Sequence, residues 1–272
     1  MDVRFTHDAA EVLHEADAFL RTKPAEHNLL LSLMTDRSAQ PEPGEYWWAV
    51  DGNDVVGVMF HSPLHFEATI APTSATAIAA IAAAAAETAP DLPGVFGDAA
   101  TAARFAGAWA SIRKTPAVPT EGQRLYELGA LHPPEGVPGG LRVATETDDE
   151  MIQSWLRGFE EDTGAEVAPP ERIRRRIANG LLWIWEHGEP VGFAGFSAPI
   201  EGVARVGLVY TPPARRGNGY AAACTAAVSQ AAVDAGATRC ILFTQLTNPH
   251  SNAIYQRLGY EPIAELVTYR FG

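Results

Sequence analysis

The sequence predicts a mixed α/β fold made of two similar units that follow one another along the chain. One observation is that alanine-rich segments, which favour helices, alternate with segments rich in β-branched and aromatic residues, which favour strands. Another is that the order of segments in the first half (two helices, a hairpin, a strand, a helix) returns in the second half. A chain of 272 residues is long enough for two ordinary domains.

A proline- and glycine-rich stretch separates the two halves. His132 to Gly140 contains three prolines and three glycines in nine residues, and such a segment cannot hold a regular helix or strand. We therefore predict an N-terminal domain over residues 1–132, a linker over 133–140 and a C-terminal domain over 141–272.

The first half is expected to begin with two helices, because Val12, Ala16 and Leu20 are spaced as on one helix face and Pro24 suits the first turn of a second helix. The turn at Asp51-Gly52-Asn53 predicts a hairpin. The expected helices are Ala9–Arg21, Ala25–Met34, Thr73–Glu87 and Ala99–Ile112, and the expected strands are Glu45–Val50, Asp54–Phe60, Leu64–Ile70 and Arg124–Leu131.

The second half repeats this pattern with a hairpin around Gly188, and Gly236 is placed to end its longest alanine-rich helix. The expected helices are Asp148–Phe159, Pro170–Asn179, Tyr220–Ala235 and Ala253–Leu258, and the expected strands are Leu181–His187, Pro190–Ala198, Val203–Tyr210, Arg239–Gln245 and Glu265–Phe271.

Composition excludes several classes of protein. A net charge of −13 argues against a general nucleic-acid binder, which would carry a basic face. Cys224 and Cys240 lack the spacing of metal ligands and are expected to be buried free thiols in a reducing compartment. The run Ala75 to Ala86 is too short and too weakly apolar to span a bilayer, and the first residues lack a signal-peptide core. We expect a cytoplasmic protein without a nucleic-acid or membrane partner.

The segment that follows Val203–Tyr210 predicts an anion site. Arg215-Arg216-Gly217-Asn218-Gly219 connects this strand to the helix that begins at Tyr220. Glycines allow close approach of a ligand to the backbone, a helix N-terminus offers N–H groups and the positive end of its dipole, and arginines add fork-shaped donors. We expect a phosphate-bearing ligand here. The alternative is a plain tight turn with solvated arginines.

Two motifs together carry a resemblance to a known family. Arg215 to Ala221 read RRGNGYA, and Asn248 to Tyr260 read NPHSNAIYQRLGY. In this combination, the region from about Gly140 to Gly272 resembles the GNAT family of acetyl-CoA-dependent N-acetyltransferases. With the repeated segment order, the resemblance implies two tandem GNAT-like acyl-CoA N-acyltransferase domains. Ile70 to Ser74 contains neither glycine nor arginine at the corresponding place, so the N-terminal unit is expected to be degenerate and to bind no cofactor. An unrelated α/β cap remains the alternative for that unit.

The resemblance also implies a reaction and the groups that would carry it. A primary amine of a small molecule or peptide attacks the thioester of acetyl-CoA, the cosubstrate, and no metal takes part. The backbone at Val209 would polarise the thioester carbonyl, and the Tyr255 phenol would protonate the departing thiolate. Asn252 is a candidate helix N-cap as well as a ligand. The residues expected to hold acetyl-CoA are Leu208, Val209, Tyr210, Arg215, Arg216, Gly217, Asn218, Gly219, Tyr220, Ala221, Asn248 and Asn252.

The general base stays open. Several family members carry a glutamate on the strand before the glycine loop, whereas Val203 to Gly207 contains no carboxylate. Glu201 lies just before this strand, the acidic run 160–162 ends an earlier helix, and a water chain is a further alternative. The run Arg174 to Arg176 is expected to form a solvated face, with attraction of an acidic substrate as the alternative reading.

Rival readings remain. GNGYAA also fits the dinucleotide motif G-x-G-x-x-A, but Pro212 to Arg216 separates it from the strand, and too little chain follows for a doubly wound sheet. His61 and His65 are four residues apart, but Pro63 between them argues against a helical metal face. A non-catalytic sensor or scaffold that binds acyl-CoA is the alternative function. The acceptor is not identified, although the acidic composition favours a cationic amine, and either a monomer or a homodimer is compatible with tandem units.

Overall fold

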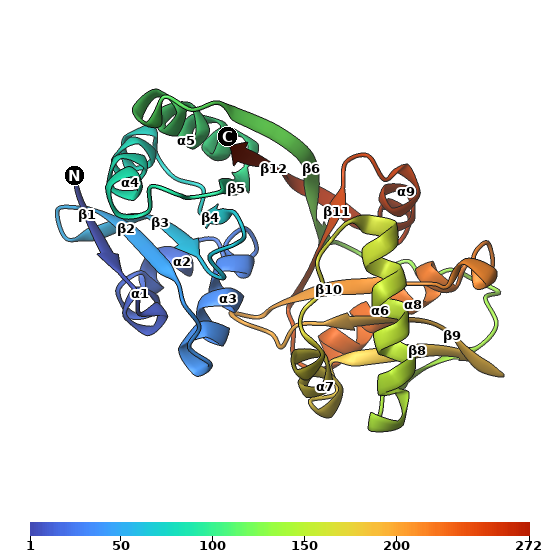
Figure 1. Cartoon of the computed structure of the whole chain (residues 1–272). Coiled ribbons are helices and arrows are strands. Elements are labelled where there is room, and N and C mark those ends of the chain that lie inside the picture. The colour runs from blue at the N-terminus through green and yellow to red at the C-terminus, as the bar shows by residue number, and fades with distance from the viewer. The chain divides into compact units, whose positions relative to one another are not determined.

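The computed structural model describes residues 1–272, except for the side chain of residue 121. The chain divides into two compact units (Figure 1). Unit 1 comprises Met1–Leu125, Thr244–Asn248 and Pro262–Gly272, and unit 2 comprises Tyr126–Phe243 and Pro249–Glu261. The predicted mixed α/β fold in two units is confirmed. The division differs from the predicted one, because the C-terminal segment lies in unit 1 and not with the rest of the second half.

Unit 1 contains a sheet in the order β1-β2-β3-β4-β5-β12-β6. The pairs are antiparallel from β1 to β4, β4 and β5 are parallel, and β5 and β12 are antiparallel. Its strands are β1 (Asp2–Thr6), β2 (Glu45–Asp51), β3 (Asp54–His61), β4 (Ala68–Ile70), β5 (Gly94–Asp98), β6 (Ala117–Leu128) and β12 (Tyr260–Phe271), and its helices are α1 (Ala9–Glu15), α2 (Asp17–Leu20), α3 (Asn28–Ala39), α4 (Ala75–Thr88) and α5 (Ala99–Arg113).

The core of unit 1 explains why β12 belongs there. The alanine faces of α4 and α5 pack with Trp47 of β2 and with Phe105 and Trp109 of α5, all fully buried. Phe271 at the end of β12 stacks on Trp109, with 5.0 Å between the ring centroids. Burying an aromatic side chain of this size stabilises a fold by about 1.5–3 kcal/mol, so the last strand contributes to the stability of unit 1.

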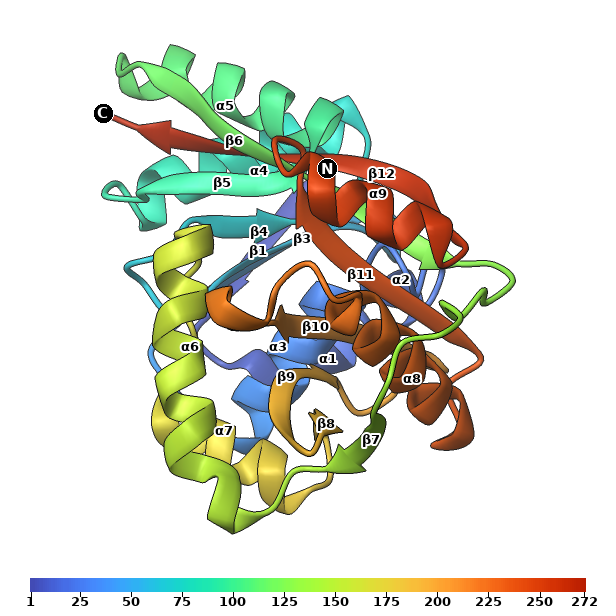
Figure 2. The same cartoon turned by 90° about the vertical axis from the view of Figure 1, so that its right-hand side faces the viewer.

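Unit 2 contains a sheet in the order β11-β10-β9-β8-β7, in which β10 and β11 are parallel and the other pairs are antiparallel. Figure 2 shows α6 and α7 on one side of β8, β9 and β10, and α8 on the other. Its strands are β7 (Gly140–Val143), β8 (Leu182–His187), β9 (Glu189–Phe196), β10 (Val203–Tyr210) and β11 (Arg239–Gln245), and its helices are α6 (Asp149–Thr163), α7 (Pro170–Ala178), α8 (Tyr220–Asp234) and α9 (Pro249–Arg257).

The two units repeat one order of elements. A first strand is followed by two or three helices, a hairpin, a strand, an alanine-rich helix and a strand parallel to the one before that helix. In unit 1 the last three are β4, α4 and β5, and in unit 2 they are β10, α8 and β11. The predicted tandem repeat is therefore present at the level of topology.

Several predicted elements differ from the structure. The strand predicted over Leu64–Ile70 is wrong for its first part, because the N–H of Phe66 donates to the carbonyl of Pro63 and closes a turn. The first helix breaks at Ala16 into α1 and α2. Three short strands, β1, β5 and β7, were not predicted, since segments of four or five residues carry little periodicity. The predicted bounds of β10 and β11 are confirmed.

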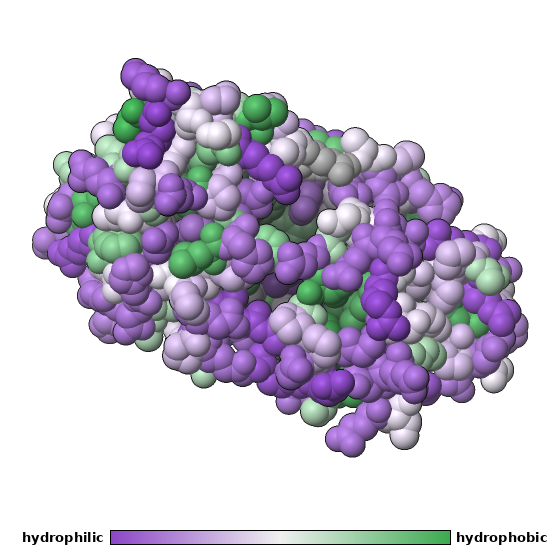
Figure 3. All heavy atoms as spheres, in the orientation of Figure 1, coloured by the Kyte–Doolittle hydropathy of each residue, from purple (hydrophilic) through white to green (hydrophobic). Residues whose placement is uncertain are grey.

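The surface and the cysteines agree with the composition. Hydrophilic residues cover most of the face in Figure 3, and the hydrophobic ones lie in small separate groups. Cys224 and Cys240 are buried free thiols, as predicted. Among the residues that the structure describes, no helix combines the length and the apolar character that crossing a bilayer requires.

Candidate active site

The loop before α8 has the geometry of an anion site. Residues Pro213–Arg215 form one turn of 3-10 helix, and Gly217 and Gly219 follow with φ of 83° and 79°. Only glycine adopts these angles without strain, and Gly219, as N-cap of α8, has no side chain that could occupy the helix N–H groups. The N-terminal N–H groups of α8 are therefore available to a ligand, and the helix dipole favours a negative charge there.

The two arginines of this loop are held by carboxylates. Arg215 forms an ion pair with Glu189, and Arg216 forms one with Asp162 while its Nε donates to the carbonyl of Thr211 at 3.0 Å. These side chains are about half exposed, and exposed ion pairs contribute only about 0–1 kcal/mol. An anionic ligand can compete for both guanidinium groups at little cost. Both arginines are exposed, so the alternative of a tight turn with solvated arginines stays open.

The side chain of Asn218 shapes the same loop. Its Nδ2 donates to the carbonyl oxygens of Arg215 and Arg216, at 3.0 and 3.2 Å. The Asn218 side chain thus supports the loop by engaging these two carbonyl groups. Its backbone N–H stays part of the predicted anion site.

The strand before the loop departs from its neighbours at one point. The parallel register of β10 and β11 runs from Val203↔Arg239 to Val206↔Leu242, although β10 continues to Tyr210. On the other side, the register with β9 shifts between Gly207 and Tyr210, and Leu208 has a φ of 56°. This is a β-bulge, which bends the strand and re-aims its backbone groups. Beyond Val206, the backbone groups of Leu208 and Val209 are therefore not paired with β11.

The side chains of two tyrosines predicted to hold the cofactor have partners within unit 2. Tyr210 is buried against α6, where a Cβ on Gly158 would overlap its hydroxyl group, and burial raises the pKa of Tyr210. The hydroxyl of Tyr220 lies 2.9 Å from Nδ1 of His187. Their backbone groups remain at the loop and the bulge, so any part they take in binding a ligand falls to the backbone. Ala221, the second residue of α8, is partly exposed.

Tyr255 of α9 lies within a buried aromatic cluster. It is 8% exposed, and its ring packs edge-on against Tyr126 and Tyr260, with centroids 6.4 and 6.1 Å apart. Burial raises the pKa of Tyr255 to about 12, while its hydrogen bond with Ser251 acts in the opposite direction. The phenol therefore keeps its proton at neutral pH. Val209 packs against the same hydrophobic cluster.

The two asparagines after β11 lie in different units. Asn252 is inside α9, which begins at Pro249, so the alternative that it caps this helix is wrong. Its Oδ1 accepts a hydrogen bond of 2.7 Å from the buried hydroxyl of Tyr126. Asn248 precedes Pro249 and belongs to unit 1, and its N–H donates to the carbonyl of Gln245 at 3.1 Å.

Two of the four carboxylates considered as general base are engaged in internal contacts. Oε1 of Glu160 accepts from the N–H of Val167 at 2.8 Å, and Asp162 pairs with Arg216. Glu161 is exposed near the end of α6, and Glu201 is exposed in the turn before β10, with a φ of 50°. These contacts single out none of the four as the base.

Sequence reasoning missed the packing of Arg176 on the α6 and α7 side of unit 2. Arg174 is exposed and paired with Asp149 at 2.9 Å, as a solvated face requires. Arg176 is only partly exposed, its Nη2 donates to the carbonyl of Phe196 at 3.3 Å, and burial lowers its pKa to about 10. The signal was present, since Arg176 follows buried Ile173 by three residues and therefore shares its helix face.

The corresponding place in unit 1 differs from that in unit 2. Ser74 is the N-cap of α4, and its Oγ accepts the N–H of Ala77 at 3.2 Å. A side chain of the chain itself thus occupies the helix N-terminus that Gly219 leaves open in α8.

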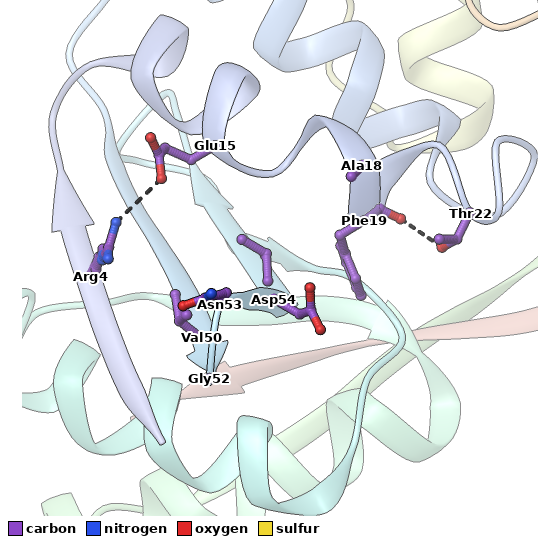
Figure 4. Close-up of a pocket in the computed structure, with 10 residues that line it drawn as sticks. Arg4, Glu15, Ala18, Phe19, Thr22, Val50, Gly52, Asn53 and Asp54 are labelled. Atoms are coloured by element: carbon purple, nitrogen blue, oxygen red, sulfur yellow. Dashed lines mark hydrogen bonds and ion pairs between the residues drawn. The ribbon is translucent and has the colours of Figure 1, made fainter.

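Unit 1 also contains an open cavity of about 510 Å³ in another place, between α1, α2 and the β2–β3 turn (Figure 4). Arg4 and Glu15 form an ion pair of 3.3 Å at one end, and Phe19 and Asp54 lie toward the other. Its lining includes no residue of α4, so it is not a counterpart of the glycine loop.

Comparison with known proteins decides the family. Residues 147–260 match the model of the acetyltransferase (GNAT) family. This part of the chain belongs to the GNAT family. It covers α6 to α9 with the bulged strand β10 and the glycine loop. GNAT membership supports acetyl-CoA-dependent acetyltransferase chemistry with an amine acceptor in general.

Relatives and solved structures agree with this assignment. Mycothiol acetyltransferase of Corynebacterium efficiens is 26% identical over 160 residues, and the match covers 55% of this chain and 54% of that protein. The chain thus matches about half of the length of that relative. A GNAT-family acetyltransferase from Colwellia psychrerythraea superposes with a TM-score of 0.66 at 11% identity, covering all of both chains. A tandem GNAT protein from the clavulanic acid biosynthesis pathway superposes with a TM-score of 0.58 at 13% identity, covering 98% of both. The two structural likenesses show the tandem fold.

Proposed function

We propose that unit 2 is an acetyl-CoA-dependent N-acetyltransferase that acetylates a primary amine on a small molecule or peptide. One observation carries the proposal: the uncapped N-terminus of α8, behind Gly217 and Gly219, follows directly on the bulge where β10 leaves β11. An anion site beside diverging strand edges suits a ligand with a pyrophosphate at one end and amide groups along its arm.

The glycine loop before α8 and the bulge in β10 bind different parts of acetyl-CoA. Backbone N–H groups from Arg215 to Ala221 bind the pyrophosphate, and the guanidinium groups of Arg215 and Arg216 exchange their carboxylate partners for it. The backbone of Leu208 to Tyr210 pairs with the pantetheine arm. An N–H at Val209 then stabilises the negative charge that develops on the carbonyl oxygen during reaction. Within unit 2, Asn252 is a further candidate contact to the pantetheine or adenine side.

The reaction itself is a direct transfer. The nitrogen of the neutral amine attacks the thioester carbon, the new C–N bond forms, the C–S bond breaks, and the nitrogen loses one proton to water. The departing thiolate gains a proton from the Tyr255 phenol, and the resulting phenolate takes up a proton from water before the next turnover. Because the pKa of Tyr255 is raised to about 12, the phenol is protonated whenever a turnover begins.

A second function is favoured by a specific observation, namely that Glu160 and Asp162 are both engaged in internal contacts. Without a base, unit 2 would bind acyl-CoA as a sensor or scaffold and would not turn it over. The test is to incubate the protein with acetyl-CoA and a broad library of primary amines, and to follow thiol release and the mass of the acetylated product. Amine-dependent thiol release supports the enzyme. Tight binding of acetyl-CoA without product from any amine supports the sensor, and absence of binding excludes both.

A further inference from the structure

The open cavity of unit 1 beside the β2–β3 turn has the size of a small-molecule site. Its volume is about 510 Å³, and its lining comes from α1 and α2 and from strands β1, β2 and β3 (Figure 4). Cavities that bind small molecules usually measure roughly 300–1,000 Å³. Every residue that lines the cavity belongs to unit 1, and none of them is assigned to acetyl-CoA. The cavity is therefore complete within one compact unit and does not belong to the acetyl-CoA site.

Two valines give the cavity an apolar floor. Trp47 and Ala49 of β2 point into the core that unit 1 forms with α4 and α5. Because successive side chains of a strand point to opposite faces, Val50 lies on the other face of the sheet. Val50 pairs with Val55 of β3, and both side chains line the cavity. They offer a hydrocarbon surface to a ligand.

The aromatic ring of Phe19 is held in place at one end of the cavity. It stacks on the imidazole of His27, with 5.1 Å between the ring centroids. His27 is fully buried, and its Nδ1 donates to the carbonyl of Leu20 at 3.0 Å, since a carbonyl oxygen can only accept. Phe19 itself is partly exposed and lines the cavity. The cavity therefore has a fixed aromatic wall, and the π-electrons of such a ring attract a cation.

Asp54 gives the same end of the cavity a negative charge. Figure 4 shows Phe19 and Asp54 toward this end, away from the ion pair of Arg4 and Glu15. The Asp54 carboxylate is exposed and has no hydrogen-bond or ion-pair partner among the described residues. At the other end, Arg4 and Glu15 neutralise each other at 3.3 Å. The lining therefore carries one negative charge that it does not balance.

The basic side chains that follow α2 in the chain are paired with other carboxylates. Arg21 forms an ion pair of 2.7 Å with Asp17, and Lys23 forms one of 3.1 Å with Glu26. Neither Arg21 nor Lys23 lines the cavity. A ligand that brings its own positive charge therefore suits this place better than a neutral or an anionic one.

We propose that this cavity binds a small organic ammonium compound. The ammonium group lies beside the Asp54 carboxylate and the Phe19 ring, and the hydrocarbon part of the ligand packs on Val50 and Val55. Unit 1, to which no acetyl-CoA is assigned, is then a binding module in its own right. The inference does not depend on the proposed acetyl transfer in unit 2.

The experiment compares three probes of the same chain length. Binding of hexylammonium, hexanol and hexanoate to the whole chain is measured by calorimetry without acetyl-CoA. We expect hexylammonium to bind roughly tenfold more tightly than hexanol, the worth of a hydrogen bond to a charged group, and hexanoate to bind most weakly. In Asp54→Asn the preference for hexylammonium should disappear. Asp51→Asn makes the same change at an exposed residue of the same turn outside the lining, and it should keep the preference.

A second variant fills the cavity and leaves its charges in place. Ala18 is exposed and lines the cavity, so Ala18→Phe should fold, as its melting temperature would show, and should bind hexylammonium at least tenfold more weakly. The inference is overturned if the wild type does not prefer hexylammonium to hexanol, or if Asp54→Asn or Ala18→Phe binds hexylammonium as tightly as the wild type. Unchanged binding in these variants would place the amine at another site, such as the acceptor site of unit 2. Failure of acetyl transfer would contradict only the proposed function.

Discussion

At the scale of single residues, Ala221 offers the cleanest test of the anion site. It is the second residue of α8 and partly exposed. A carboxylate in the first turn interacts favourably with the helix dipole, so Ala221→Asp should fold, yet it would repel a pyrophosphate. We expect the variant to bind acetyl-CoA roughly tenfold to a hundredfold more weakly, a loss of about 1.4–2.8 kcal/mol measured by calorimetry.

Ala221→Asn is the matched control, since it has nearly the same shape without the charge. Its affinity for acetyl-CoA should stay close to that of the wild type. Equal weakening in both variants would point to steric exclusion. Unchanged acetyl-CoA affinity in Ala221→Asp would show that the pyrophosphate does not bind at the N-terminus of α8.

Tyr255 allows a test that separates chemistry from packing. Tyr255→Phe removes one hydroxyl group and leaves the ring between Tyr126 and Tyr260. If the phenol protonates the thiolate, kcat and kcat/KM should both fall by roughly 10²–10⁴, with little change in acetyl-CoA affinity. Steady-state kinetics and calorimetry supply both quantities.

A packing role makes the opposite prediction for this position. Phe would then be tolerated, and Tyr255→Ala would lower the melting temperature. If Tyr255→Phe turns over as fast as the wild type while chemistry limits the rate, a group other than Tyr255 protonates the thiolate.

At the scale of elements, a charged cluster holds the start of α6. Asp148 accepts two hydrogen bonds of 2.8 Å from Arg142 of β7 and one of 2.8 Å from the N–H of Thr145. These contacts, Arg142 first, lower the pKa of Asp148 to about 2 from 3.8. The pKa of Asp148 is lower in the folded state than in the unfolded state, so its ionised form stabilises the fold. This contribution to the free energy of unfolding is complete above about pH 4 and is lost as pH falls toward 2.

We therefore expect Asp148→Asn to be less stable than the wild type at pH 7, by about 2 kcal/mol. The difference in melting temperature should narrow as pH falls from about 4 toward 2. Asp149→Asn is the control, because its partner Arg174 is exposed, and its effect should be smaller. A difference that does not change with pH would mean that the charge of Asp148 is not what stabilises this end of α6.

At the scale of the whole molecule, the two units are not equivalent. The helix N-terminus that Gly219 leaves open in α8 is capped by Ser74 in α4. We expect calorimetry to give one acetyl-CoA bound per chain. In Ala221→Asp, calorimetry should detect no other site that binds acetyl-CoA with unchanged affinity. A stoichiometry near two would mean that unit 1 also binds the cosubstrate.

The glycine loop, the long helices and the paired strands β10 and β11 could be predicted because their signals are local. Proline, glycine and alanine act on the backbone within a few residues, so the bounds of β10 and the start of α8 at Tyr220 follow from the sequence. The family motif is likewise continuous in the chain. These segments determined the fold class and the position of the proposed acetyl-CoA site.

Tertiary structure decided the rest, because it depends on which distant segments meet. Strand β12 joins unit 1 through its pairing with β5 and the stacking of Phe271 on Trp109, and no local pattern marks that choice. In the same way, the sequence places Arg176 in a run of three arginines and does not show that its Nη2 donates to the carbonyl of Phe196 at the end of β9. That contact depends on how α7 packs on the sheet, and no pattern within a few residues encodes such packing.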